Sequence, residues 1–280
     1  MIKSLIYNNG AAVLSQVGRF GNVLNLGVKR PIIMVGTGRC GTTLVDKILK
    51  SHSGIAKYPG EANELWHPKL EPHNKAQINS PPIEVDPKKY TELSIANWPN
   101  NQDNVIQRTF TGFHLVSGKS KVFFVKSAMI SFMIPKILSI FPDARFLHVY
   151  RFGPSVVESY FKKNFGKDER YSFTEEEYYR ICARYWNSCI LEIERVKNEL
   201  ALEVNDAFYE FSYESLCENP SGILAELADF MSVDYNQFEF DLSTIKSTNY
   251  KVSNKSGNEK IREIVDAELS VAMKLKNYLT

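Results

Sequence analysis

The run from Gly36 to Thr43 has the residue types and the spacing of a loop that binds an anion. It reads Gly36-Thr37-Gly38-Arg39-Cys40-Gly41-Thr42-Thr43 and lies between a short apolar run and a segment with helical apolar spacing. Glycines allow a tight turn whose backbone N–H groups converge, and a helix N-terminus adds partial positive charge. With two threonine hydroxyl groups and the charge of Arg39, this stretch is predicted to form an anion cradle.

The spacing of Gly36 and Gly41 is that of a Walker A loop, but two features argue against a nucleoside triphosphate kinase. Thr42-Thr43 stands where Lys-Ser/Thr should follow the second glycine, so the lysine that reaches the β- and γ-phosphates is missing. Arg151 ends a later predicted strand, where a kinase of this class has an Asp that helps to hold Mg²⁺. A guanidinium binds phosphate bidentately, so Arg151 indicates a second phosphate in place of the metal ion.

Strands and helices alternate along the chain, and these elements must position the motifs. Short apolar runs predict strands at 31–35, 122–125, 145–150 and 208–211. Helical patterns are found at 43–49, 135–141, 154–163, 174–200, 220–231 and 258–278, and residues 1–29 predict a short helix and a loop with several glycines. Thr174 and Glu177 form a capping box for the longest helix. This alternation predicts an α/β fold with a parallel sheet.

One long stretch has no such pattern. Residues 59–99 contain seven of the twelve prolines and show little periodicity. We therefore predict an irregular insertion over 59–120, serving as a lid and acceptor region, within a single domain that covers 1–280. The alternative is a surface excursion that is merely tolerated.

Charge and composition exclude several classes of protein. The 280 residues include 34 Lys and Arg against 32 Asp and Glu, a net charge of +2, which argues against a nucleic-acid groove. No apolar run reaches the roughly 18 residues that span a bilayer, and the N-terminus lacks the continuous apolar stretch of a signal peptide. Four cysteines without a C-x-x-C pair predict reduced thiols and a cytoplasmic location, and no spacing of His and Cys indicates a metal site.

Taken together, the two anion motifs resemble those of the sulfotransferases that use 3′-phosphoadenosine-5′-phosphosulfate (PAPS). The 5′-phosphosulfate loop of that family reads G-x-x-R/K-x-G-T-T, which residues 36–43 match. Its 3′-phosphate motif is a strand ending in Arg, followed eight residues later by Ser, and Arg151 and Ser159 match these places. The family form R-D-P-R-D is replaced here by Arg151-Phe-Gly-Pro-Ser155. Tyr213-Glu-Ser-Leu216 is similar to the family segment Y-E-D-L, whose Tyr lies near the nucleotide.

This resemblance, which covers about residues 31–231, implies a P-loop-like three-layer fold with a short central parallel sheet flanked by helices. It implies PAPS as the cofactor, 3′-phosphoadenosine 5′-phosphate (PAP) as the product, and no metal. The residues implied in cofactor binding are Gly38, Arg39, Cys40, Gly41, Thr42, Thr43, Arg151, Ser159, Tyr213, Lys251 and Lys255. The last two lysines are also consistent with a charged loop beside a helix.

The resemblance also suggests catalytic residues. Gly60-Glu61 is similar in placement to the segment of tyrosylprotein sulfotransferases that carries a catalytic Glu, so Glu61 is the leading general base, with Glu64 and His114 as alternatives. Lys126 matches a family lysine at a strand end and would stabilise the bridging oxygen together with Arg39. Ser247 lies in a segment similar to one that carries a site Ser in the tyrosylprotein enzymes.

The predicted activity is transfer of a sulfuryl group from PAPS to a hydroxyl acceptor by in-line displacement. The acceptor, a carbohydrate, a tyrosine or a small molecule, stays open, as does a homodimer. Two alternatives of other classes are a P-loop nucleotide kinase and a non-catalytic nucleotide-binding protein. The kinase would require ATP and Mg²⁺, and the binding protein would bind PAP without moving sulfate.

Overall fold

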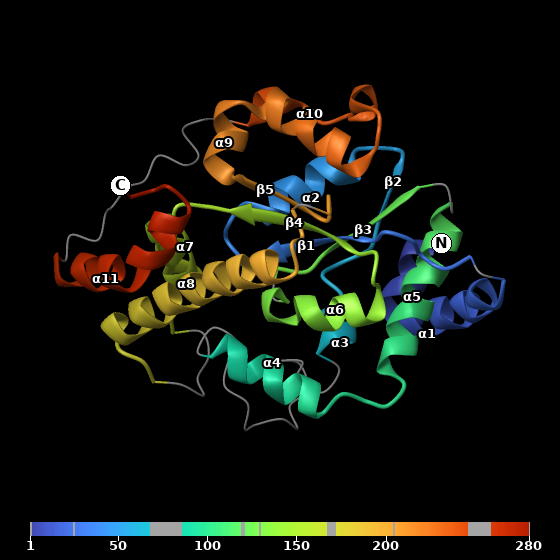
Figure 1. The fold of residues 1–280 in the computed structure, drawn as a ribbon, viewed down its shortest axis with the longest axis horizontal. Helices are drawn as coiled ribbons and strands as arrows, with labels where there is room; N and C mark the ends of the chain where they lie inside the picture. Colours follow the sequence, from blue (N-terminus) through green and yellow to red (C-terminus); the bar gives the residue numbers. More distant parts are fainter. Residues whose placement is uncertain are drawn as a thin grey trace.

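A five-stranded parallel sheet forms the centre of the molecule (Figure 1). The computed structural model describes residues 2–24, 26–67, 86–118, 121–128, 130–166, 172–203, 205–245 and 259–279. The strands are β1 (Ile32–Gly36), β2 (Ile55–Lys57), β3 (Val122–Lys126), β4 (Arg145–Tyr150) and β5 (Phe208–Ser212), and they lie side by side in the order β2-β3-β1-β4-β5. The four predicted strands are confirmed, and β2 is an addition.

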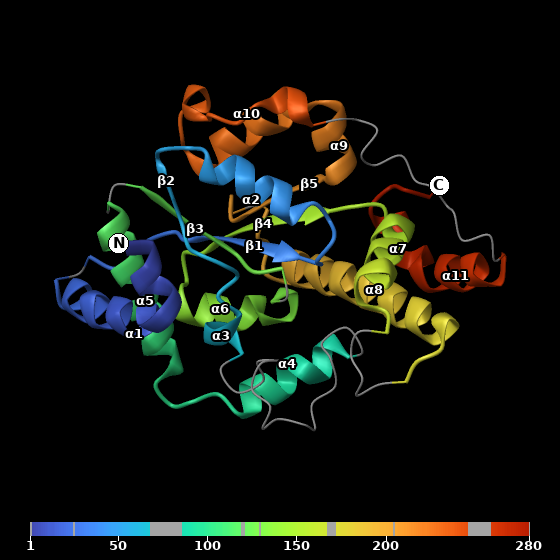
Figure 2. The ribbon, with the colours of Figure 1, turned by 180° about the vertical axis from the view of Figure 1, so that it is seen from behind.

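Helices cover both faces of this sheet, which confirms the expected three-layer α/β fold. They are α1 (Ile2–Val23), α2 (Thr42–Lys50), α3 (Asn63–Trp66), α4 (Pro87–Ala96), α5 (Gln102–Ser117), α6 (Ile134–Ile140), α7 (Gly153–Asn164), α8 (Glu175–Glu199), α9 (Tyr213–Glu218), α10 (Pro220–Met231) and α11 (Glu259–Leu275), with 3₁₀ turns η1 (Ser131–Met133), η2 (Tyr235–Gln237) and η3 (Leu242–Thr244). Helices α2, α9 and α10 lie over one face, while α1, α5, α6 and α8 lie over the other (Figures 1 and 2).

The central strand β1 is buried on both sides because it contributes alternate residues to two cores. Ile33 and Val35 pack in the core beneath α1, α5, α6 and α8. Ile32 and Met34 point the other way, into the core beneath α2, α9 and α10. A strand covered by helices on both faces reads as a continuous apolar run, which is why this strand is evident in the sequence.

The N-terminal helix is longer than the sequence predicts. In place of a short helix and a loop, α1 continues through Gly18 and Gly21 to Val23. A Cβ at Gly18 would lie 1.8 Å from the carbonyl oxygen of Arg108 in α5, and one at Gly112 of α5 would lie 1.9 Å from that of Leu14 in α1. These glycines therefore let the two helices approach to backbone contact, and they do not mark a loop.

The prediction of irregular chain over 59–120 is wrong for the part that forms α4 and α5. Helix α5 has sixteen residues, and its Ile106 and Phe110 are fully buried in the core. The apolar positions 106, 110 and 113 follow a helical period, but the prolines upstream obscured it. Residues 68–85 and 119–120 lie outside the described part of the chain, and the role of this region as a lid and acceptor site stays a prediction.

Helices α7, α8 and α11 form a third core at one end of the sheet (Figure 1). The predicted capping box of α8 is confirmed, since Thr174 Oγ1 accepts a bond from Glu177 N and the Glu177 side chain accepts one from Thr174 N. All four cysteines are buried and none forms a disulfide. Among the described helices, none combines the length and hydrophobicity needed to cross a membrane.

Candidate functional site

The carboxyl ends of all five strands meet at one edge of the sheet, as a parallel arrangement requires. Each end leads directly to a segment that contains a predicted site residue: Glu61 after β2, Lys126 at the end of β3, the Gly36–Thr43 loop after β1, Arg151 after β4 and Tyr213 after β5. The strand order places these five segments in that sequence along the edge. With strands roughly 4.8 Å apart, they span about 19 Å. In open α/β sheets this edge is where ligands bind.

The loop between β1 and α2 has the backbone conformation expected of an anion cradle. Gly36 and Gly41 have φ of 135° and 89°, and Arg39 has φ of 66°, which is uncommon for a residue with a side chain. The Ser131 hydroxyl group lies 3.1 Å from Gly36 N and 2.8 Å from Gly36 O, and so holds the base of the loop. Thr42 is the first residue of α2. Strain at Arg39 is of the kind that is retained at binding sites.

Cys40 contributes to this loop through its backbone only. Its side chain is fully buried, and its Sγ lies 2.8 Å from Thr37 Oγ1. Burial raises the pKa of the Cys40 thiol to about 12, although the bond with Thr37 opposes this. The thiol is therefore neutral and packs beneath the loop, so that only the backbone of Cys40 can face a bound anion.

Three predicted residues from distant parts of the chain come together beside the loop. Arg39 Nε donates to Ser159 Oγ in α7 at 2.9 Å, and Arg151 Nη1 donates to Arg39 O at 3.4 Å. The Nε atom of Arg151 is buried and has no hydrogen-bond partner. Neither arginine forms an ion pair with any residue that the structure describes. The two cations are thus available for an anionic ligand.

Tyr213 supports both the loop and Arg151. The guanidinium carbon of Arg151 lies 4.9 Å from the centre of the Tyr213 ring, a cation–π contact. On the side of the loop, a Cβ at Gly41 would lie only 2.2 Å from Cδ2 of Tyr213. Burial raises the pKa of Tyr213 to about 12, so the side chain is a neutral platform. Gly41 is therefore needed both for its left-handed backbone and for the close approach of this ring.

Glu61 and Lys126 form an ion pair at the other end of the same edge. Lys126 Nζ lies 2.7 Å from Glu61 Oε1, and their side chains are 12% and 34% exposed. The Ser127 hydroxyl group donates to the Glu61 carbonyl oxygen. Glu61 stands between Gly60 and Ala62, whose φ values of 69° and 55° are both left-handed. A buried alanine in this conformation is strained, which is typical of residues that hold a functional group in place.

The other candidate bases are less well placed or not described. His114 lies within α5 and is 8% exposed, and its Nε2 lies 2.8 Å from Lys121 O. Lys121 precedes β3, so His114 belongs to the opposite edge of the sheet and is not the base at this site. The side chain of Glu64 lies outside the described part of the chain, as do Ser247, Lys251 and Lys255.

The sequence did not single out two residues that connect these parts. Glu214 accepts bonds from Phe152 N at 3.1 Å and from the Tyr278 hydroxyl group at 2.7 Å. Its position next to Tyr213 in a motif was a usable signal. For Tyr278, no local pattern indicates a role.

Comparisons with known proteins agree with this geometry. The model of the sulfotransferase family matches residues 31–237, about three quarters of the chain. A sulfotransferase from Mycobacterium avium has a similar structure, with a TM-score of 0.61 and 12% identity over 98% of this chain and 81% of that one. A sulfotransferase from Mycobacterium tuberculosis H37Rv gives 0.56 and 16% over 93% and 83%.

A sulfotransferase domain from the curacin biosynthetic pathway is similar as well, with a TM-score of 0.55 and 18% identity over 90% of this chain and 99% of that one. No curated protein sequence matches the chain. At such identities the solved structures show a shared fold, and the family match covers well over half of the chain. The chain therefore belongs to the sulfotransferase family, a family of PAPS-dependent transferases.

Proposed function

We propose that this protein binds PAPS and transfers its sulfuryl group to a hydroxyl group of an acceptor. The observation that carries the proposal is the order of groups along one sheet edge. Two places for anions, the Gly36–Thr43 loop and the pair Arg151 and Ser159, lie next to each other, and the Glu61–Lys126 ion pair lies beyond the loop. A ligand with two separated anionic groups, next to a reacting hydroxyl, matches this order.

The residues present fit the two anionic ends of PAPS. Backbone N–H groups from Gly38 to Thr42, with the hydroxyl groups of the two threonines, would hold the 5′-phosphosulfate. Arg151 and Ser159 would hold the 3′-phosphate, and the buried Nε of Arg151 that lacks a partner supports this assignment. Tyr213 would lie beside the nucleotide. Lys251 and Lys255 are proposed as further contacts from outside the described residues.

The reaction needs a base, cations and alignment. PAPS supplies a sulfuryl group that is activated by its bond to the 5′-phosphate. Glu61 would accept the proton of the acceptor hydroxyl as its oxygen attacks sulfur, a contribution of about 10²- to 10⁴-fold in rate. Lys126, held 2.7 Å from Glu61, would stabilise charge on the bridging oxygen of the departing phosphate. Arg39 is proposed to assist there, although its side chain is directed to Ser159 in this structure.

The acceptor is proposed from the residues around Glu61. The Gly60-Glu61 placement and Ser247 favour a tyrosine or a carbohydrate hydroxyl, and a small molecule is the remaining choice. The cytoplasmic location, the absence of a metal requirement and a homodimer stay predictions. Within the described residues, no group of three or more His, Cys, Asp or Glu side chains is placed to hold a metal ion.

Transfer of ³⁵S from labelled PAPS to tyrosine peptides, glycans, lipids and small phenols tests this function. We expect Glu61→Gln to keep the Kd for PAP within about threefold and to lower turnover by about 10²- to 10⁴-fold. Glu239→Gln is the matched control, because Glu239 is exposed and follows Phe238, whose backbone pairs with His52 ahead of the amino end of β2. Full activity of Glu61→Gln would place the base elsewhere. Binding of PAP without transfer to any acceptor would favour the non-catalytic reading, and tight ATP binding with Mg²⁺-dependent transfer would favour the kinase.

A further inference from the structure

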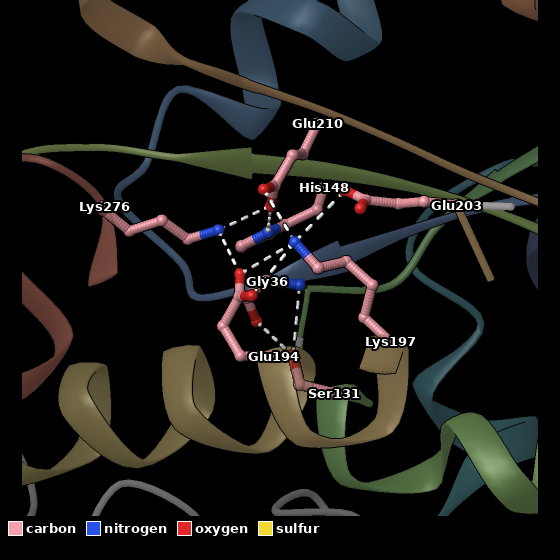
Figure 3. A network of polar contacts seen from close by, with 8 residues as sticks. All are labelled: Gly36, Ser131, His148, Glu194, Lys197, Glu203, Glu210 and Lys276. Atoms are coloured by element: carbon pink, nitrogen blue, oxygen red, sulfur yellow. Dashed lines mark hydrogen bonds and ion pairs between the residues drawn. The ribbon is translucent and has the colours of Figure 1, made fainter. Parts of the chain in front are cut away.

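An ion cluster that is largely buried, apart from the exposed Glu203, connects the segment after α11 to β4 and β5. It consists of His148, Glu194, Lys197, Glu203, Glu210 and Lys276 (Figure 3). The Lys276 side chain is 3% exposed, and its Nζ contacts Glu194 and lies 2.6 Å from Glu210 Oε2. Burial would raise the pKa of Glu210, but bonds from His148 and Lys276 outweigh this effect and lower it. Glu210 is therefore ionised, and it fixes Lys276 against the sheet.

Tyr278, two residues further on, reaches the segment that follows β4. Its hydroxyl group donates to Glu214 Oε2 at 2.7 Å, and the other oxygen of Glu214 accepts from Phe152 N at 3.1 Å. The Tyr278 ring lies edge-on to Phe152 and to Tyr150, with centroids 5.4 Å and 6.1 Å apart. Burial and the nearby Glu214 raise the pKa of Tyr278, so its hydroxyl group stays protonated and can donate.

These contacts lie on the side of the Arg151 backbone opposite to its guanidinium group. Tyr150 and Phe152 are its neighbours in the chain, and neighbours in extended chain point to the side opposite to the residue between them. Accordingly, the two aromatic side chains face Lys276 and Tyr278, with Lys276 Nζ 4.6 Å from the Tyr150 ring centre. Arg151 faces Tyr213 and the anion loop.

Glu214 links the same C-terminal contact to the second support of Arg151. It follows Tyr213 directly, and Tyr213 carries the guanidinium on its ring. Both the backbone beside Arg151 and the platform beneath it are thus connected through one carboxylate to the Tyr278 hydroxyl group. A change at Tyr278 would act on Arg151 through these two supports and not by contact with the ligand.

We infer that Tyr278, held in place by Lys276, is a positioning residue that aims Arg151 at the 3′-phosphate of PAPS. The inference rests on the proposed function and deepens it, because it assigns part of the nucleotide selectivity to residues at the far end of the sequence. The 3′-phosphate distinguishes PAP from adenosine 5′-phosphate. A displaced Arg151 should therefore weaken the binding of PAP and leave the binding of adenosine 5′-phosphate unchanged.

The Tyr278→Phe variant tests this with a small change, since the ring and its packing remain. Calorimetric titration should show a Kd for PAP about 3- to 10-fold higher than that of the unchanged protein, and a Kd for adenosine 5′-phosphate that stays within twofold. Tyr209→Phe is the matched control. Its hydroxyl group also lies 2.7 Å from a carboxylate, that of Glu226, but in the amino-terminal half of β5, and both Kd values should stay unchanged.

A second variant makes the pathway explicit. Glu214→Gln should weaken PAP binding by a similar factor, and the double variant with Tyr278→Phe should show little further loss, because both changes break one connection. Equal weakening of both nucleotides in Tyr278→Phe, or no change in either, would overturn the inference. If the unchanged protein binds adenosine 5′-phosphate as tightly as PAP, the proposed 3′-phosphate site itself fails, and the inference fails with it.

Discussion

Replacing Arg151 with alanine should weaken PAP binding strongly while leaving the fold intact. Among the described residues, the Arg151 side chain donates a long hydrogen bond, 3.4 Å to Arg39 O, and lies 4.9 Å from the centre of the Tyr213 ring. A cation–π contact at a partly exposed site contributes about 0.5–1 kcal/mol, so the loss in free energy of unfolding should be small. A charge-assisted hydrogen bond to phosphate contributes about 1.5–3 kcal/mol, and its loss raises the Kd for PAP roughly 10- to 150-fold.

Isothermal titration with PAP, adenosine 5′-phosphate and ATP at one fixed ionic strength measures this effect. We expect Arg151→Ala to change the Kd for adenosine 5′-phosphate by less than about threefold, because that nucleotide lacks the 3′-phosphate. Arg19→Ala removes an exposed arginine of α1 and controls for the change in net charge. It should leave all three affinities unchanged.

Two results would refute this reasoning about Arg151. One is a Kd for PAP that does not change on substitution. The other is ATP binding as tightly as PAP in the unchanged protein, since ATP has no 3′-phosphate and would then occupy the loop as in a kinase. Either result would remove Arg151 from the nucleotide site.

Stability provides two further predictions. Gly112→Ala should lower the free energy of unfolding by about 1–3 kcal/mol in urea titrations, because its Cβ would lie 1.9 Å from Leu14 O. Gly27→Ala is the control and should cause no such loss, because its Cβ would lie 3.7 Å from the nearest atom. A Gly112→Ala variant that is more stable than the unchanged protein would contradict the close contact of α1 and α5. Burial raises the pKa of Glu210, but the bonds from His148 and Lys276 lower it by more, so the pKa in the folded protein is below that in the unfolded chain. Below about pH 4.5 the unfolded chain therefore binds a proton at this group that the folded chain does not. Above that pH, Glu210 should contribute its full stabilisation. As the pH falls toward the pKa of Glu210 in the folded protein, the free energy of unfolding should decrease by up to about 1.4 kcal/mol per pH unit, and Glu210→Gln should reduce this slope between pH 5 and 3. An unchanged slope in the variant would contradict the lowered pKa of Glu210.

The sequence predicted the fold where a local pattern records the burial of an element. Strand β1 is covered on both faces and reads as an unbroken apolar run, and the α8 capping box is a pattern of four residues. Strand β2 has only three residues and no readable period. Helix α5 was missed because the prolines before it made the whole region appear irregular, although the spacing of Ile106 and Phe110 is helical.

The candidate site shows the same division. Arg39, Arg151, Ser159 and Tyr213 lie in motifs, and the structure brings them together. Their functional roles stay predictions. Glu214 and Tyr278 are 64 residues apart, and their contact depends on how α11 packs against α8 and α7. Such contacts depend on single residues that are far apart in the chain, so no spacing in one sequence can predict them.

The strand order has a consequence for engineering. Donor recognition is assigned to the loop after β1 and to the chain beyond β4, whereas the chain between β2 and β3 supplies Glu61 and the elements around it. The two tasks thus occupy separate stretches of polypeptide, although they share one edge of the sheet. We therefore expect substitutions in α4, within the predicted acceptor region, to leave donor binding unchanged. In such variants, helix α5, Lys126, the loop after β1 and the chain beyond β4 would keep their own residues.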